Sequence, residues 1–399
     1  MVKIEPFAVE AWMDAHETKC EYNIAETCCA SISLDQLQQL SEDKERPLID
    51  TANILNYGDI RGSDALRQNL SRLYSAKGNF LSPQNILTTA GAIQANYLVA
   101  YSLVGPGDHV ICHYPTYQSL YEVPKQLGAK VDLWHTRAED DWAPKIDDLK
   151  SLIKPNTKLI ILNNPQNPTG AIIKKPLLQQ IVDVASEHNI VLFGDEVYRP
   201  LFHSINPMDS EFPPSLLSMG YKKTIVTGSM SKAYSLAGVR VGWIASRDPE
   251  LIETIAEARH YTTISVSQLD EQVAAYALHP NTVHSLLARN IQLAQKNLEL
   301  MERFMIKNED ECSWVKPLAG TTAFVKISRD GKPVDSVDFC QQLLEKTGVL
   351  WVPGSTCFGD EFKGYVRIGY VNHTEIIKEG LDKATKFIRK HLDNVKLAE

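Results

Sequence analysis

Short runs of apolar residues alternate with longer amphipathic stretches between about residues 60 and 245. Gly, Pro or Asn residues bound each run, as they commonly bound buried strands. Four runs are clear: His109–Cys112, Lys158–Leu162, Ile190–Phe193 and Thr224–Thr227. Helical stretches such as Leu177–His188 lie between them. Strands alternating with helices indicate an α/β domain with a largely parallel sheet, and such sheets bind ligands at the carboxyl ends of their strands.

The pattern changes after about residue 285. A long helical stretch is followed by short apolar segments, and the last helix is amphipathic. The features are helix Val283–Phe304, segments Trp314–Ile327, Val349–Val352 and Gly364–Gly369, and a final apolar face of Ile377, Leu381, Ala384 and Ile388. A short helix carrying Trp12 and Met13 is predicted over Pro6–Lys19. We therefore predict a large domain over residues 49–284 and a small C-terminal domain over 285–399, which the N-terminal segment 1–48 joins.

Composition and charge narrow the function classes. The 399 residues suit two or three domains, and 44% of them are hydrophobic, as in soluble globular proteins. The net charge of -8 argues against nucleic acid as the main partner, because phosphate-backbone binding needs a basic surface. No apolar run approaches the ~18 residues of a membrane span, and the acidic N-terminus does not resemble a signal peptide.

The seven cysteines are scattered, with no C-x-x-C pair. Neither a zinc site nor a disulfide framework is therefore indicated, and we expect no metal. Reduced thiols in a cytoplasmic protein are the simplest interpretation. We interpret the adjacent Cys28 and Cys29 as small packing residues, because no base is identifiable beside them.

Lys232 follows the last apolar run directly, in the sequence Gly-Ser-Met-Ser-Lys that begins at Gly228. Ser229, Ser231 and Arg240 offer hydrogen-bond donors for a phosphate dianion, and a guanidinium suits its geometry best. A lysine among cationic groups can have a lowered pKa, which favours Schiff-base chemistry. Taken alone, Lys232 is more simply explained as a solvated lysine.

Two further segments at strand ends carry polar side chains. Asp195 and Tyr198 follow the run that ends at Phe193, where an acid and a phenol can hold a pyridinium nitrogen and a phenolic oxygen. Asp195 alone is equally well explained as a helix cap. Asn167 lies in Asn-Asn-Pro-Gln-Asn-Pro-Thr-Gly, a loop that two X-Pro steps make rigid.

This ordered set closely resembles the fold-type I enzymes of the class I/II aminotransferase family, which use pyridoxal 5'-phosphate (PLP). The resemblance covers about residues 50–390. It implies a mostly parallel sheet of the seven-stranded type with helices on both faces, and a smaller α/β domain. It also implies that Lys232 holds PLP as a Schiff base, that Asp195 pairs with the ring nitrogen, and that Asn167 and Tyr198 bind the ring oxygen. Ser229, Ser231 and Arg240 would then bind the phosphate.

The same resemblance implies further roles. In this family a glycine turn before a helix binds the phosphate through backbone N–H groups, which here gives Gly91, Ala92 and Ile93. Tyr117 would stack on the ring, and Tyr57 would reach the phosphate of the partner subunit in a homodimer with shared active sites. Arg367 would bind the substrate carboxylate. A core aromatic and a surface arginine are the plainer alternatives for the last two.

The segment Tyr22–Ser31 departs from the family pattern, because it lacks the usual glycine and carries polar side chains. A second resemblance, to the PLP-dependent arginine cyclases that form capreomycidine or enduracididine, accounts for this difference. It rests on three segments, Val9–Trp12, Tyr261–Ser267 and Gly348–Gly354. Such enzymes eliminate water from a hydroxylated arginine and close a ring through the guanidinium.

A guanidinium substrate needs carboxylates or carbonyls around it. Glu10 and Glu17 are seven residues apart and share one face of a helix, with His16 beside them, and Glu26 and Thr27 lie in the variant segment. Each is a candidate for binding the substrate or moving a proton. A solvated helix face is the alternative for Glu10 and Glu17, and an ordinary surface or packed histidine is the alternative for His16. For Glu26 the alternative is a residue without a role.

Three enzymatic functions and one non-enzymatic function remain open from the sequence. The leading hypothesis is a PLP enzyme that dehydrates and cyclises a hydroxylated arginine. The others are an ordinary aminotransferase with a 2-oxo acid acceptor and an oxygen-using PLP arginine oxidase, whose Asn-Ile-Ala-Asp segment is similar to residues 23–26. A binding protein of the same fold is disfavoured because Lys232 and Asp195 are both present.

Overall fold

The computed structural model describes residues 4–75 and 79–399. The first three residues of the predicted N-terminal segment lie outside this range. Within it, a seven-stranded sheet forms the centre of the larger part of the molecule, and its strand order is β2-β8-β7-β6-β5-β3-β4. Its strands are β2 (Ile86–Thr89), β3 (His109–Tyr114), β4 (Lys130–His135), β5 (Thr157–Asn163), β6 (Val191–Asp195), β7 (Thr224–Ser229) and β8 (Gly242–Ser246). Only β8 runs antiparallel to its neighbours.

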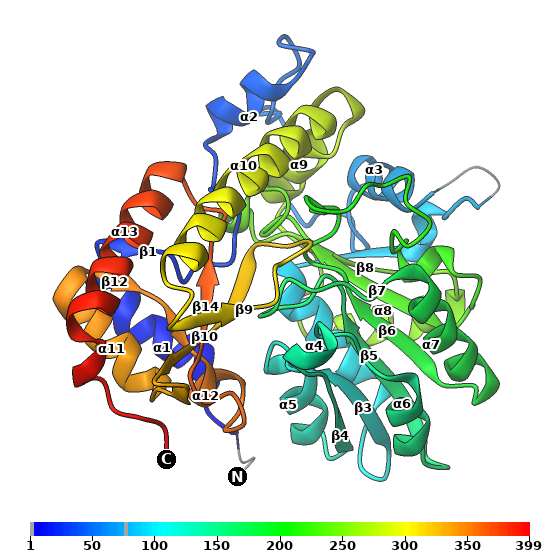
Figure 1. Ribbon diagram of the computed structural model, residues 1–399. Coiled ribbons are helices and arrows are strands. Elements are labelled where there is room, and N and C mark those ends of the chain that lie inside the picture. The colour runs from blue at the N-terminus through cyan, green and yellow to red at the C-terminus, as the bar shows by residue number, and fades with distance from the viewer. Residues whose placement is uncertain (1–3, 76–78) are drawn as a thin grey trace.

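Helices cover both faces of this sheet, as Figure 1 shows. They are α3 (Asp64–Tyr74), α4 (Gly91–Leu103), α5 (Ser119–Gln126), α6 (Ile146–Leu152), α7 (Lys175–Glu187), α8 (Pro249–Arg259) and α9 (Gln268–Ala277). The middle strands are buried along nearly their whole length, because helices pack on each side of them. The predicted fold class, a mostly parallel seven-stranded sheet covered by helices, is confirmed.

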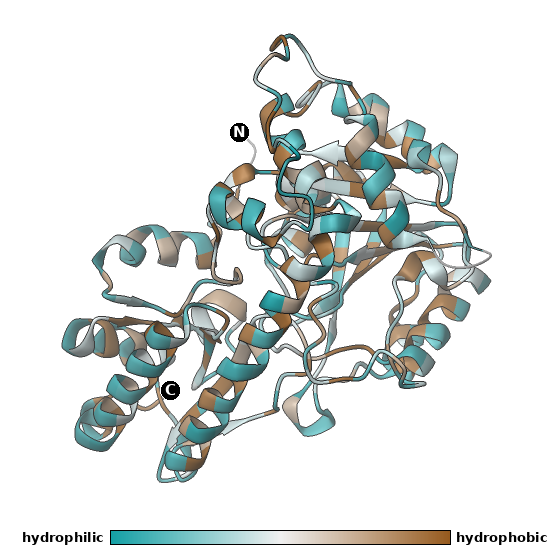
Figure 2. Cartoon of the chain, turned by 90° about the horizontal axis from the view of Figure 1, so that it is seen from above, coloured by the Kyte–Doolittle hydropathy of each residue, from teal (hydrophilic) through white to brown (hydrophobic). Residues whose placement is uncertain are grey.

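A second, antiparallel sheet forms the centre of the smaller part, with the order β11-β10-β14-β13 and β9 paired to β10. Its strands are β9 (Cys312–Trp314), β10 (Thr322–Arg329), β11 (Lys332–Pro333), β13 (Val352–Pro353) and β14 (Tyr365–Gly369). The accompanying helices are α10 (Pro280–Lys307), α11 (Ser336–Thr347), α12 (Gly354–Phe358) and α13 (Thr374–His391). The predicted apolar face of the last helix is buried. In Figure 2 the outer helices carry both hydrophilic and hydrophobic stretches, as amphipathic helices do.

The N-terminal residues contact this second part. The elements are α1 (Ala8–His16), the 3-10 turn η1 (Glu17–Lys19), β1 (Tyr22–Asn23) and α2 (Leu34–Leu40). Strand β1 pairs in parallel with β12 (Val349–Leu350), and the indole nitrogen of Trp12 donates to the carbonyl of Trp351 at 2.9 Å. These contacts fix α1 against the smaller part of the molecule. The exact domain boundaries remain a prediction.

No helix in the described ranges 4–75 and 79–399 is long and apolar enough to cross a membrane.

Candidate functional site

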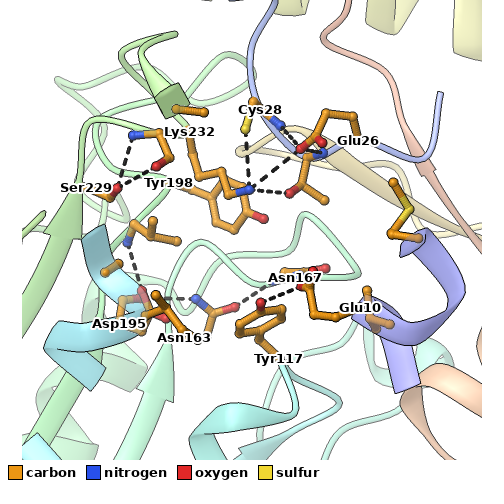
Figure 3. Close-up of a pocket in the computed structure, with 18 of the residues that line it drawn as sticks. Glu10, Glu26, Cys28, Tyr117, Asn163, Asn167, Asp195, Tyr198, Ser229 and Lys232 are labelled. Atoms are coloured by element: carbon orange, nitrogen blue, oxygen red, sulfur yellow. Dashed lines mark hydrogen bonds and ion pairs between the residues drawn. The ribbon is translucent and has the colours of Figure 1, made fainter. Parts of the chain in front are cut away.

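A cavity of about 290 Å³ opens at the carboxyl ends of β5, β6 and β7, where the sequence places its chemistry (Figure 3). The residues that line it and carry charge or hydrogen-bonding groups are Glu10, Glu17, Glu26, Thr27, Cys28, Asn96, Tyr117, Asn163, Asn167, Asp195, Tyr198, Ser229, Ser231, Lys232, Arg240 and Arg367. Nearly all the sequence-predicted site residues are therefore brought together from segments far apart in the chain. They come from α1 and η1, from the segment after β1, from α4, from the ends of β3, β5, β6 and β7, from the turn before β8 and from β14.

Lys232 lies in the loop that follows β7, and its amine points toward the variant segment after β1. Its Nζ donates to Oγ1 of Thr27 at 2.6 Å, lies 3.5 Å from Sγ of Cys28, and forms an ion pair with Oε1 of Glu26 at 3.8 Å. Burial lowers the pKa of Lys232, but the acidic groups of Cys28, Tyr198 and Glu26 raise it by more, so the net pKa lies above its usual value. This opposes the lowered pKa that we expected from neighbouring cations.

Asp195 ends β6 at the floor of the cavity, where it is 3% exposed. Its Oδ2 accepts from Nδ2 of Asn96 at 3.0 Å and its Oδ1 accepts from the amide of Val197 at 3.1 Å. Burial raises the pKa of Asp195 to about 6, although these two donors favour the carboxylate. A buried carboxylate of this kind is a natural partner for a positively charged ring nitrogen.

Asn96 is a site residue that the sequence did not reveal. It lies on α4, and its Oδ1 accepts from the hydroxyl of Thr227 at 2.7 Å while its Nδ2 holds Asp195. Asn163 was missed as well, and its Oδ1 accepts from the amide of Asn167 at 2.7 Å. Asn96 lies among the mostly apolar residues of α4, which is a weak sequence signal, because the helix also contains Gln94 and Ser102.

Donors for an anion gather at one end of the cavity, beside the start of α4. Nη1 of Arg240 donates to Oγ of Ser231 at 3.3 Å, and Oγ of Ser229 donates to the same hydroxyl at 2.9 Å. Gly91 opens α4 with φ of +80°, and a Cβ there would lie only 2.5 Å from the Arg240 guanidinium. The free amides of a helix N-terminus therefore face serine hydroxyls and a guanidinium, which suits a phosphate group.

Arg367 lies on β14 and is 3% exposed. Its Nη2 donates to the carbonyl of Ala25 at 3.1 Å and its Nη1 to Oδ1 of Asn167 at 3.4 Å, while its buried Nε has no partner in the structure. A buried guanidinium with an unused donor favours a carboxylate ligand beside it.

Tyr117 connects the strand-end loops to α1, because its hydroxyl donates to Oε1 of Glu10 at 2.6 Å. Glu10 of α1 and Glu17 of η1 both line the cavity, although α1 ends at His16 and the two residues do not lie on one continuous α-helix. His16 is not among the lining residues, and its ring packs against Trp12 with the centroids 4.2 Å apart. Tyr57 also lies away from the cavity of its own chain, and it is 79% exposed.

The interpretation of Cys28 as a packing residue is wrong, because its side chain lines the cavity instead of packing in the core. Burial is the largest of the causes that raise the pKa of its thiol to about 11. Cys29 is fully buried, as a packing residue would be.

Comparison with known proteins agrees with this site. The family model for class I and II aminotransferases matches residues 31–383. The chain belongs to the class I and II aminotransferase family. Its members carry PLP, and the cavity fits that cofactor, because an anion cradle, a lysine and a buried acid lie around it in the family's arrangement.

Individual relatives differ in activity. Capreomycidine synthase of Streptomyces vinaceus is 30% identical over 77% of this chain and 75% of its own, and an aspartate aminotransferase of Thermotoga maritima is 27% identical over 84% of each. Among solved structures, a PLP-dependent aminotransferase of Streptococcus suis is 39% identical, with a TM-score of 0.88 and coverage of 97% of this chain and 98% of its own. The PLP-dependent cyclase OrfR is 25% identical, with a TM-score of 0.84 and the same coverage. The chain is therefore similar both to cyclases and to transaminases.

Proposed function

We propose that this PLP-dependent enzyme dehydrates and cyclises a hydroxylated arginine or a related guanidino amino acid, with a cyclic product such as capreomycidine or enduracididine. The supporting observation is the balance of charge in the cavity. Arg240 suits the cofactor phosphate, Asp195 the ring nitrogen and Arg367 the substrate carboxylate. Of the three other lining carboxylates, Glu26 is paired with Lys232, and Glu10 and Glu17 have no cation of the cavity beside them. An ordinary dicarboxylate substrate would be repelled by them, whereas a guanidinium would be attracted.

The proposal assigns a role to three cavity residues. Bound PLP withdraws electrons from the α carbon of the substrate. Arg367 fixes the carboxylate through two parallel hydrogen bonds, and Lys232 moves the α proton. Glu10, held by the Tyr117 hydroxyl, binds the guanidinium and presents its nitrogen for ring closure.

A direct test mixes the purified holoenzyme with L-arginine, β- and γ-hydroxyarginine and aromatic amino acids, with and without 2-oxoglutarate, and follows the products by mass spectrometry. Loss of one water from a hydroxyarginine without any keto acid supports the proposal and identifies the substrate. Glutamate formation that requires 2-oxoglutarate, with no dehydration, makes the enzyme an aminotransferase. Oxygen consumption with L-arginine points to the oxidase instead.

Glu10 provides a sharper test of guanidinium binding. A charge-assisted hydrogen bond contributes about 1.5–3 kcal/mol, so Glu10→Gln is expected to raise KM for the guanidino substrate roughly 10- to 150-fold. Turnover at saturation should change much less. An unchanged KM would place the guanidinium elsewhere in the cavity.

An aminotransferase is the second candidate, and the aspartate aminotransferase relative favours it. Its acceptor would be a 2-oxo acid whose carboxylate binds Arg367. The missing glycine of segment 22–31 would then be a determinant of specificity only.

We also infer that two copies of the chain form a homodimer with shared active sites. Support comes from Tyr57, which is 79% exposed, and from the neighbouring exposed apolar residues Ile54, Leu55 and Ile60. Sedimentation analysis should give twice the mass of 44.7 kDa. Tyr57→Phe should weaken cofactor binding without separating the copies, and a monomeric, fully active enzyme would refute the inference.

A further inference from the structure

A buried glutamine connects two of the loops that form the cavity. Gln166 lies in the loop after β5, directly before Asn167, and is 2% exposed. Its Nε2 donates to the carbonyl of Pro115 at 2.7 Å, and Pro115 lies two residues before Tyr117 in the loop after β3. Gln166 therefore joins the loop of Asn167 to the loop of Tyr117, although Gln166 itself does not line the cavity.

The side-chain amide of Gln166 is held in one orientation by its partners. Its Oε1 accepts from the hydroxyl of Thr169, so that Nε2 faces the carbonyl of Pro115. The same Nε2 lies 3.3 Å from Nε2 of His113. Burial lowers the pKa of His113 to about 3, so the neutral ring can accept this second hydrogen bond. Both N–H groups and the oxygen of the amide thus have partners inside the protein.

The backbone around Gln166 fixes the shape of the loop that carries Asn167. The amide of Gln166 donates to the carbonyl of Ala171 at 3.0 Å, and its carbonyl accepts from the amide of Gly170 at 2.8 Å. The amide of Asn167 donates to Oδ1 of Asn163 at 2.7 Å. Because the loop is closed by its own hydrogen bonds, the Gln166 side chain links it as a unit to the loop after β3.

The two linked loops carry groups that suit one cofactor ring. Nη1 of Arg367 donates to Oδ1 of Asn167 at 3.4 Å, which leaves Nδ2 of Asn167 to donate to the ring oxygen. Tyr117 lines the same cavity, where its ring can stack on the cofactor (Figure 3). A stacking ring and a hydrogen-bond donor serve the same ligand only where their relative position is fixed to within about 0.5 Å.

We propose that Gln166 is a positioning residue for the PLP ring, because it sets the place of the Asn167 donor relative to the aromatic ring of Tyr117. This role concerns the cofactor alone, so it is independent of the substrate proposed above. A donor that stabilises negative charge on the ring oxygen weakens the hold of that oxygen on a shared proton. The proton affinity of the Lys232 nitrogen that binds the cofactor is then lower as well.

The first test is Gln166→Met, which keeps an unbranched side chain of similar length and removes the amide. The readout is the pH titration of the visible absorbance of the holoenzyme, together with PLP affinity. Loss of a hydrogen bond to a charged group changes an equilibrium constant by about tenfold or more. We therefore expect the midpoint of the titration to rise by about one pH unit and PLP affinity to fall by about tenfold.

A second substitution tests whether Gln166 acts through Asn167. Asn167→Ala removes the donor to the ring oxygen and should raise the midpoint by itself. In the double variant, Gln166→Met should then add little, because the group that it positions is already gone. Shifts that add in full would mean that Gln166 affects the cofactor by another route, and would overturn the proposal.

The partners of Gln166 offer a matched pair of variants. Thr169→Val removes the hydroxyl that orients the Gln166 amide and should raise the midpoint, whereas Thr169→Ser keeps the hydroxyl and should behave as the wild type. Asn308→Leu is the control for lost stability, because Asn308 is a buried amide of the smaller part that donates to the carbonyl of Phe304 at 2.7 Å. It should reduce stability and leave the midpoint unchanged.

The outcomes separate positioning from a merely structural role. A wild-type midpoint and wild-type PLP affinity in folded Gln166→Met overturn the proposal, and so does an equal shift in Asn308→Leu. If Gln166→Met does not fold, the comparison of Thr169→Val with Thr169→Ser decides, and equal midpoints in these two variants overturn it. None of these readouts needs a substrate, so they hold whether the enzyme cyclises or transaminates.

Discussion

Asn96 is the position where a single substitution tests the cofactor-binding end of the site most directly. The change is Asn96→Leu, which keeps the volume and removes the amide. Asn96 donates to Oδ2 of Asp195 at 3.0 Å and accepts from Thr227 at 2.7 Å, and it is 6% exposed. The substitution therefore takes one donor from a buried carboxylate and leaves one buried hydroxyl without a partner.

The magnitude follows from these contacts. A hydrogen bond to a charged group contributes about 1.5–3 kcal/mol, which corresponds to roughly 10- to 150-fold in an equilibrium constant. Asn96 lowers the pKa of Asp195, so its loss moves that pKa further up from about 6 and favours the neutral acid. A neutral acid pairs less well with a protonated ring nitrogen, so both PLP affinity and turnover should fall by this factor.

The assay is a titration of the apoprotein with PLP, followed by visible absorbance and by turnover at saturating cofactor. Asn69→Leu is the matched control, because Asn69 is also buried but donates to the carbonyl of Ala275 away from the cavity. It should reduce stability without changing PLP affinity per folded molecule. Wild-type PLP affinity and turnover in Asn96→Leu would show that Asp195 does not depend on this amide, and would refute the reasoning.

Three further outcomes follow from the structure. The pKa of the Cys28 thiol is raised to about 11, so this thiol should be alkylated slowly at pH 8 and about tenfold faster with each pH unit above that. Mass spectrometry of the labelled peptide measures the rate, and an apparent pKa at or below about 8.5 would contradict the prediction. Burial lowers the pKa of His203 to about 4, so the unfolded chain binds more protons than the folded chain between pH 6.5 and 4, and the free energy of unfolding should fall as the pH falls through that window. In urea unfolding, His203→Gln should reduce the dependence of the free energy of unfolding on pH by up to about 1.4 kcal/mol per pH unit. Trp12→Phe removes the hydrogen bond to Trp351, so it should cost about 1 kcal/mol of stability. It should also raise KM, because α1 carries Glu10 and leads directly into Glu17 of η1, and both line the cavity; lower stability with an unchanged KM would separate α1 from substrate binding.

The central sheet could be predicted where its strands are buried on both faces, and less well elsewhere. The runs that became β3, β5, β6 and β7 are continuous apolar segments. Strand β4 lies at the edge, with Lys130 and His135 exposed, so its sequence does not read as a buried strand. Strand β8 begins two residues after Arg240 and has only five residues, Gly-Trp-Ile-Ala-Ser, which form no separate apolar run in the sequence.

The cavity residues could be predicted where they follow a strand, since the carboxyl ends of parallel strands meet at one edge. Asp195, Asn167 and Lys232 are of this kind. Asn96 could not be found in this way, because its role depends on how α4 packs over β6 and β7. His16 lies on the same helix as Glu10, but its ring packs against Trp12 and does not line the cavity.

The unusual sequence of residues 22–31 changes how this segment packs against β14 as well as which side chains it brings to the cavity. Gly369 at the end of β14 has no side chain, and a Cβ there would lie 1.8 Å from the carbonyl oxygen of Glu26, so the segment can approach the strand only because this residue is glycine. The close approach lets Ala25 accept from Arg367 while Glu26 faces Lys232. Arg367 belongs to the antiparallel sheet and Lys232 to the loop after β7 of the large sheet, so this segment joins the two groups that we propose bind the substrate carboxylate and move its α proton. A carboxylate bound to Arg367 would therefore lie on the same wall of the cavity as Lys232 and Glu26, so that a change in this segment should affect the positions of all three groups together.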